Sequence, residues 1–480
     1  MHAGRDWKWT AGIEGQTSRN DYPFFTDNGT VYNTADDARL RMANNAYWSR
    51  GARAAVRRDA VSSDQSLSFL WLDYRKEYPG IPNTFVSDSR AYTRRSDWMG
   101  AWRVRAFSGR SDWGAGFQIK HFNDAYHDPA LSLNDLDYQE ARSATSLEID
   151  AHARIFVTEK LDVSASTRLG HESLKPTSTP YTNAIAHPSA TRDEARFSGS
   201  LLEKVTRNFS LTMEAGMARV LFRAANVQDF PVDTPHALSH GAAPPALRGG
   251  VKWRTFAGTF EAFVRHEERA ASSQELLGDN NGIRPNLNLS ASKTEAFSFL
   301  HAWERPGFQL QTGLFWHRYE NPIRLEPYGS SSFLRYANGP AYRAAGVEED
   351  FRIERRDFES RTSFTLQGIR ILEGPAAGNR PAYQSPFEGH AEAFWKPRTS
   401  FANIVLGPLI DVLGPYYPGD LNFPDARRST EWELGAHLSA RRPHAELAVD
   451  ARNLHDRNYR DFAYSVRSGR NYSLTLSINL

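Results

Sequence analysis

The last ten residues of the chain alternate strictly between apolar and uncharged polar side chains. One set of alternate positions holds Tyr472, Leu474, Leu476, Ile478 and Leu480, and the other holds only Asn, Ser and Thr. Because successive side chains on a strand point to opposite faces, this segment predicts a β-strand with one fully apolar face. Such a strand fits a soluble sheet, and it equally fits a barrel with lipid outside and water inside.

The same period of two recurs along most of the chain. Its clearest example is the predicted hairpin of 147–155 and 161–169, in which aliphatic residues alternate with residues such as Glu148, Asp150 and Arg154. Further strands are predicted at 7–16, 46–57, 65–74, 102–106, 113–120, 194–206, 209–222, 246–255, 258–268, 294–305, 307–319, 356–368, 389–396, 402–413, 430–441 and 445–454. With the terminal strand these make 19, and the Gly- and Pro-rich segment 369–386 would supply a twentieth.

Short and long connections alternate between the predicted strands. The short turns are Ser108–Arg110, Thr158–Lys160, Thr206–Asn208, Phe256–Ala257, Pro306–Gly307 and Arg442–His444. The long loops are Asn20–Asn45, Phe122–Arg142, Glu172–Asp193, Arg223–Pro244, Arg269–Lys293 and Glu320–Arg355. Outer-membrane barrels sort their loops in this way, whereas sandwiches and propellers do not. We therefore expect residues 1–480 to form a single all-β domain, a transmembrane antiparallel up-and-down β-barrel of about 20 strands. The alternative is a soluble sandwich whose charged residues form the solvent face.

Composition narrows the class of protein. The formal net charge of +2 provides no long-range attraction for nucleic acid. The absence of cysteine excludes disulfide scaffolds, zinc–thiolate sites, iron–sulfur clusters and thiol catalysis. A mean hydropathy of −0.59 is too polar for a helical membrane protein. The 12% of aromatic residues suits the interfacial girdles of a barrel as well as a large core.

Two segments resemble a known family. Asn453-Leu454, Asp456, Asn458-Tyr459 and Arg460, followed by Gly469-Arg470-Asn471-Tyr472 and the terminal strand, resemble the C-terminal end of TonB-dependent outer-membrane receptors. The loop Asn20–Asn45 resembles the first long extracellular loop of many of these receptors. Chains of that family usually end in an aromatic residue, whereas this one ends in Leu480, which slightly weakens the expected signal for barrel assembly.

The resemblance implies a location, partners and a missing part. The family has a 22-stranded barrel filled by an N-terminal plug domain, through which the TonB complex delivers energy. This sequence looks like such a barrel without the plug and the first hairpin, which would leave 20 strands. The first 15 residues contain neither an apolar signal core nor a cleavage site, so we do not expect this chain to be exported as written. Either the protein is cytosolic, or the sequence is the later part of a longer precursor, which is the interpretation we favour. The implied location is the outer membrane, in contact with lipid and lipopolysaccharide.

The first long loop offers the candidate ligand-binding residues. Tyr22, Phe24 and Phe25 could stack on a ligand, or they could pack the loop onto its neighbours. Asp27 and Asn28 carry oxygen atoms of the kind that bind Ca²⁺, but the spacing does not match an EF-hand and solvated turn residues are the better interpretation. The 15 histidines include no helical i, i+4 pair and have no cysteine companions, so we expect neither a metal site nor a cofactor.

Arginine greatly outnumbers lysine, 49 to 9. Arg103, Arg105, Arg154 and Arg168 could line a lumen and guide anionic ligands by bidentate contacts, although a genome rich in arginine codons is the better explanation of the excess. No nucleophile elbow, acid–base pair, P-loop or GxGxxG motif is present, so we expect no enzymatic activity. The favoured function is an outer-membrane receptor for a siderophore–iron complex, cobalamin or a similar scarce nutrient. The alternatives are a passive channel and a soluble all-β enzyme or carbohydrate-binding protein.

Overall fold

The computed structural model describes residues 6–19, 23–26, 38–41, 44, 46–77, 90–128, 138–176, 189–227, 236–278, 283–284, 286–327, 334–397, 399–417, 419–424, 427–456 and 470–478. Regular structure in these ranges consists of β-strands and one short helix, α1 (Ser273–Leu277). No helix in the same ranges is long and apolar enough to cross a membrane.

Most strands belong to one large sheet. These are β1 (Asp6–Ser18), β4 (Tyr47–Ala60), β5 (Ser63–Glu77), β6 (Tyr92–Ser108), β7 (Ser111–Asp128), β8 (Tyr138–Phe156), β9 (Leu161–Pro176), β10 (Ser189–Lys204), β11 (Phe209–Val227), β12 (His236–Ala242), β13 (Pro245–Thr255), β14 (Gly258–Arg269), β16 (Ser292–Arg305), β17 (Phe308–Glu320), β20 (Tyr342–Arg355), β21 (Phe358–Ile371), β22 (Phe387–Trp395), β23 (Asn403–Leu413), β24 (Glu431–Arg442), β25 (Ala445–Arg452) and β26 (Asn471–Ile478). A hairpin of β2 (Pro23–Thr26) and β3 (Ala38–Arg41) and a small sheet of β15 (Ile283–Arg284), β18 (Ile323–Pro327) and β19 (Leu334–Asn338) lie outside it.

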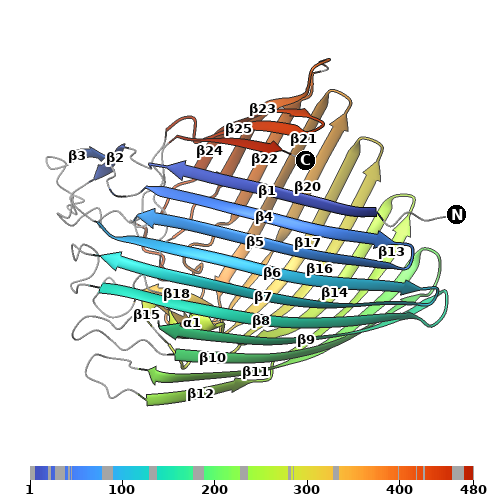
Figure 1. Cartoon of the computed structure of the whole chain (residues 1–480), viewed down its shortest axis with the longest axis horizontal. Coiled ribbons are helices and arrows are strands. Elements are labelled where there is room, and N and C mark those ends of the chain that lie inside the picture. Colours follow the sequence, from blue (N-terminus) through green and yellow to red (C-terminus); the bar gives the residue numbers. More distant parts are fainter. Residues whose placement is uncertain are drawn as a thin grey trace.

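With the exception of β12, each strand of the large sheet pairs antiparallel with the next one along the wall, and the sheet curls into a nearly closed barrel (Figure 1). Strand β11 pairs with β13 over its first half and with β12 over its second half, so β12 and β13 share one position in the wall. The wall therefore has 20 positions, as the period-two pattern predicts. In the described part of the chain no backbone pairing joins β1 to β26.

The predicted position of the twentieth strand was wrong. The segment 372–386 contains no strand, and the missing strand is β20, which lies in the predicted long loop Glu320–Arg355. Its apolar face carries Val347, Phe351 and Ile353, but Glu349 interrupts the alternation and hides the pattern. The predicted loops also contain short strands: β2 and β3 lie in Asn20–Asn45, and β12 lies in Arg223–Pro244.

The two faces of the wall differ in polarity as predicted. A single register row crosses seven strands through Val163, Leu201, Met213, Gly249, Val264, Phe297 and Trp316. The opposite face of the same strands packs against α1 through residues such as Ala190 and Phe222, and Figure 1 shows α1 inside the wall. The apolar row therefore faces outward, and the charged positions face the lumen.

The height of the outward apolar band matches a bilayer. His171 of β9, Arg219 of β11 and Arg318 of β17 each lie ten residues beyond the first residue of their strand, next to a short turn. With about 3.3 Å per residue and a tilt of about 45°, ten residues rise roughly 23 Å, close to the apolar band of about 25 Å in outer-membrane barrels. Charged outward-facing side chains thus begin at the level of the lipid headgroups.

Glu349 is an exception inside this band. Its register partners are Thr312 on β17 and Phe364 on β21, and the Thr312 hydroxyl donates a hydrogen bond of 2.9 Å to its carboxylate. The Thr312 hydroxyl and the carboxylate therefore satisfy one another in an apolar surrounding, where an unpaired polar group is costly.

We expect Leu314→Arg to destabilise the barrel by roughly 2–4 kcal/mol, because Leu314 is half-exposed on the outward face of β17 near the middle of the apolar band. The measurement is the free energy of unfolding of the protein folded into phospholipid vesicles, from denaturant titration. Gln311→Arg, on the lumen face of the same strand, is the control and should change that free energy by less than about 0.5 kcal/mol. Equal effects of the two substitutions would mean that the faces are assigned the wrong way round.

Candidate functional site

Two of the loop residues predicted to bind ligand, Phe24 and Phe25, lie at the end of the barrel that carries the long loops (Figure 1). Phe24 and Phe25 are in β2, where they pair with Leu40 and Arg39 of β3. Tyr22, Asp27 and Asn28 lie outside the described residues. Their predicted role in ligand binding stays a prediction.

The terminal strand has the predicted arrangement over the residues that the structure describes. Tyr472, Leu474 and Leu476 are exposed on the outward face of β26, opposite outward residues of β25. Ile478 pairs with Ala445 at the start of β25, and Leu480 lies outside the described residues. The expected role of this strand in barrel assembly stays a prediction.

The four arginines predicted to line a lumen are on its wall, and three of them are paired. Arg105 bonds to Asp112, and Arg154 bonds to Asp162. Arg168 lies 3.2 Å from the Glu148 carboxylate. The charges of these three arginines are therefore largely neutralised by carboxylates of the same wall. Arg103, by contrast, has no hydrogen-bond or ion-pair partner among the described residues.

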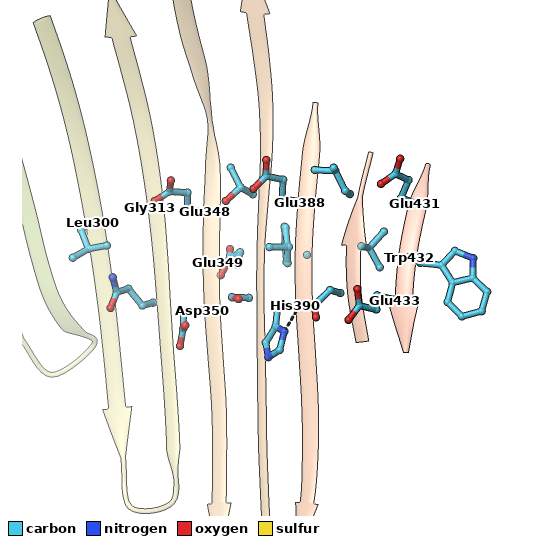
Figure 2. A pocket seen from close by; sticks show the side chains of 18 residues that line it. Leu300, Gly313, Glu348, Glu349, Asp350, Glu388, His390, Glu431, Trp432 and Glu433 are labelled. Carbon is cyan, nitrogen blue, oxygen red and sulfur yellow. Dashed lines mark hydrogen bonds and ion pairs between the residues drawn. The ribbon is translucent and has the colours of Figure 1, made fainter. Parts of the chain in front are cut away.

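A cavity of about 640 Å³ lies on the inner wall between β16 and β24. Two neighbouring register rows supply its polar side chains (Figure 2). The first row holds Glu348, Glu388 and Glu431, and the second holds Asp350, His390, Asp411 and Glu433. Trp432 lies between Glu431 and Glu433 in sequence and points away from the cavity in Figure 2, as alternation requires.

Part of this acidic wall is satisfied by internal partners. The His390 Nδ1 atom lies 2.6 Å from Asp411, and Arg452 donates a hydrogen bond of 2.7 Å to the other oxygen of the same carboxylate. Arg361 donates to Asp350 at 2.8 Å, and the Tyr416 hydroxyl donates to Glu431 at 3.4 Å. These contacts fix the second row more firmly than the first.

Glu348, Glu388 and Glu433 have no hydrogen-bond or ion-pair partner among the described residues. Three unpaired carboxylates across three alternate strands give this wall a negative potential that favours cationic groups over anionic ones. Sequence reasoning missed the cavity because β20 was placed in a loop. The signal was present, since Glu431 and Glu433 are spaced by two and so share a face.

The mouth of the lumen is narrowed by segments that fold inward. Leu276 and Leu277 of α1 and the nearby Leu289 are buried against the inner surface of β9, β10 and β11. Ile323 of β18 and Tyr336 of β19 pack against the same cluster. The Ser273 hydroxyl donates a hydrogen bond of 2.6 Å to Glu172 of β9. The helix is therefore fixed to the wall by both apolar and polar contacts.

A capping box holds α1 in place. Ser272 accepts a hydrogen bond from the backbone N–H of Glu275, whose carboxylate accepts one of 2.8 Å from the Ser272 N–H. Arg269, at the end of β14, donates to the same carboxylate at 2.7 Å. Burial would raise the pKa of the Glu275 carboxyl, but the hydrogen bonds from Arg269 and Ser272 outweigh it, so this pKa lies below its usual value.

In the described part of the chain, no cluster of three or more histidine and carboxylate side chains is arranged to hold a metal ion.

We expect acid to loosen α1. The pKa of Glu275 is lower in the folded protein than in an unfolded loop. The stability that its capping contacts provide is therefore fully present above the usual pKa of a glutamate carboxyl. It is lost as the pH falls through the lower pKa of the folded state. The capping box contributes about 1 kcal/mol. A nitroxide label at the exposed position 274 should become more mobile on acidification. Glu275→Gln should reduce this pH dependence and Glu159→Gln, in a short turn, should not; an unchanged response in Glu275→Gln contradicts the assignment.

No protein-family model matches the chain, and no curated protein matches its sequence. Solved structures share its fold. The ferric yersiniabactin uptake receptor FyuA from Yersinia pestis has a TM-score of 0.72 at 12% identity, covering 99% of this chain and 81% of that chain. The ferric-catecholate import receptor Fiu from K12 E. coli has a TM-score of 0.70 at 13% identity, covering 99% and 82%. The copper transporter OprC has a TM-score of 0.73 at 11% identity, covering 99% and 81%. These proteins are TonB-dependent receptors, so the resemblance is confirmed at the level of the fold: this chain has the β-barrel fold of the TonB-dependent outer-membrane receptors.

Proposed function

We propose that this chain is the barrel of an outer-membrane receptor that takes up a scarce nutrient, such as a siderophore–iron complex or cobalamin. The observation that carries the proposal is the wall itself. Its outward face carries an apolar band of bilayer height, and its inward face lines a lumen with charged residues. Solved structures with the same fold are receptors and transporters for siderophores and metals. The three similar structures differ in cargo, so the fold supports uptake as a class of function and leaves the nutrient open.

In this proposal the loops at the extracellular end make the first contact with the ligand. The aromatic residues Phe24 and Phe25 and their neighbours Tyr22, Asp27 and Asn28 are our candidates for it. The inward-folded α1 would narrow the path behind them, and the acidic cavity would lie further along it. Passage would be driven through a plug and the TonB complex. The prediction that a plug and a first hairpin lie outside this sequence stays a prediction.

Ligand binding tests the role of the loop. We expect the protein, expressed behind an export signal, to fractionate with the outer membrane and to bind one member of a panel of ferric siderophores and cobalamin. The double substitution Phe24→Ala and Phe25→Ala should weaken that binding about tenfold, since aromatic side chains at the centre of a binding surface often dominate its affinity. Leu40→Ala, on the paired strand β3, is the control for loop folding. Recovery of the protein in the soluble fraction would contradict the proposal.

The acidic cavity supports a second candidate, a passive channel selective for cations. In planar bilayers an open lumen should give a reversal potential favouring cations, and the triple substitution of Glu348, Glu388 and Glu433 to Gln should lower that preference several-fold. The matched control replaces three outward-facing glutamates, Glu268, Glu295 and Glu320, with glutamine. Irregular leak without selectivity, in both wild type and variants, would count against the channel and leave the receptor proposal standing.

A further inference from the structure

Glu349 places a carboxylate within the outward apolar band. It lies six residues before the end of β20 at Arg355, near the middle of the band. Among the described residues, the other outward-facing carboxylates lie next to a short turn, as Glu203 does, or at the level of the headgroups, as Glu268 and Glu295 do. An ionisable side chain at membrane depth is costly, so its presence marks a functional position.

The contact with Thr312 uses only part of the hydrogen-bonding capacity of Glu349. The Thr312 hydroxyl donates one hydrogen bond, whereas an ionised carboxylate can accept about four. Thr362, on the adjacent strand β21, also faces outward, and its hydroxyl has no hydrogen-bond partner among the described residues. It is in register with Phe351, two residues from Glu349, and no hydrogen bond joins Thr362 to Glu349. The same face thus holds an acceptor with free capacity and a donor without an acceptor.

The next strand of this face carries only small side chains beside the polar pair. Gly389, Ala391 and Ala393 of β22 face outward, in register with β21. A Cβ atom added at Gly389 would lie 3.8 Å from its nearest neighbours, an ordinary van der Waals distance, so packing within the wall does not require this glycine. Small residues allow a second protein surface to approach closely, as they do between transmembrane helices, and bring polar side chains within hydrogen-bonding distance.

We propose that this face of β20, β21 and β22 is the contact between two copies of this chain in the membrane. Thr362 of each copy donates a hydrogen bond to the partner's Glu349. A two-fold axis along the membrane normal makes the two hydrogen bonds equivalent, because in such an interface residue i meets j and j meets i. Glu349 lies two residues further from the short turns than Thr362, a rise of about 5 Å on a tilted strand, which the glutamate side chain spans.

A second copy is the favoured occupant because this face is complementary to itself. It supplies both the donor that Glu349 can still accept from and the acceptor that Thr362 lacks, whereas hydrocarbon supplies neither. The inference rests on the membrane location in the proposed function, and it is independent of the nutrient.

Cross-linking between copies tests the contact. The chain contains no cysteine, so a single introduced thiol reports on it without background. Leu366→Cys places this thiol on the outward face of β21, beside the proposed contact. Ile149→Cys is the matched control on the outward face of β8, across the wall, where Ile149 is 46% exposed and Leu366 is 48% exposed. With the full chain in phospholipid vesicles, a bifunctional thiol reagent should cross-link Leu366→Cys into dimers and leave Ile149→Cys monomeric.

Substitutions in the Leu366→Cys background test the hydrogen bonds. Glu349→Leu and Thr362→Val should each raise about tenfold the protein-to-lipid ratio that gives half-maximal cross-linking, because each removes one partner of a charge-assisted hydrogen bond. The double variant should be no weaker than the single ones, since all three lose the same contact. Thr312→Val removes a hydroxyl from the same face but not from the contact, and should cross-link as the parent does.

Cross-linking at neither position, or equally at both, would overturn the proposal. So would unchanged cross-linking in both Glu349→Leu and Thr362→Val. Nutrient uptake, measured separately in cells, keeps the two hypotheses apart. Absence of uptake by a protein that dimerises through this face contradicts only the proposed function, and uptake by a monomer contradicts only this inference.

Discussion

The structure depends on the need of a backbone inside a bilayer to satisfy its own hydrogen bonds. Hydrocarbon offers no partners for N–H and C=O groups, so each strand requires a neighbour on both edges. Among the described residues, the register from β1 to β26 meets this need along the wall, except at the seam between β1 and β26 and at β12, which is paired with β11 alone. With 20 positions in an alternating wall, β1 and β26 run in opposite directions, so the seam has the geometry of one more antiparallel pair.

In this wall, the alternation of side chains places apolar residues on the outward face and charged residues on the inward face. Outward side chains form a band that lipid can cover, with Glu349 tied to Thr312 as its exception. Inward side chains neutralise one another along much of the wall, as Arg154 and Asp162 do. Among the described residues, the side chains on the inner surface that have no ion-pair partner include Arg103 and the carboxylates of Glu348, Glu388 and Glu433.

Period-two alternation located nearly all of the wall, because strand faces are set by local sequence. It failed at β20, where the outward Glu349 breaks the apolar series. It also could not reveal the cavity, which is built from side chains on separate strands and becomes a surface only when the register is known. The inward packing of α1 was hidden for a different reason. Loops carry no periodic signal, and the buried cluster that holds both Leu276 and Phe222 joins residues distant in sequence.

The shared position of β12 and β13 has a consequence for the mechanics of the rim. The lower half of β11 is paired with β13 and its upper half with β12, and the two partners meet at Pro244, whose carbonyl accepts a hydrogen bond of 2.9 Å from Ala218. Because β12 is paired with β11 alone, whereas β13 is paired with both β11 and β14, fewer backbone hydrogen bonds resist bending in the upper part of this sector than in the wall below it.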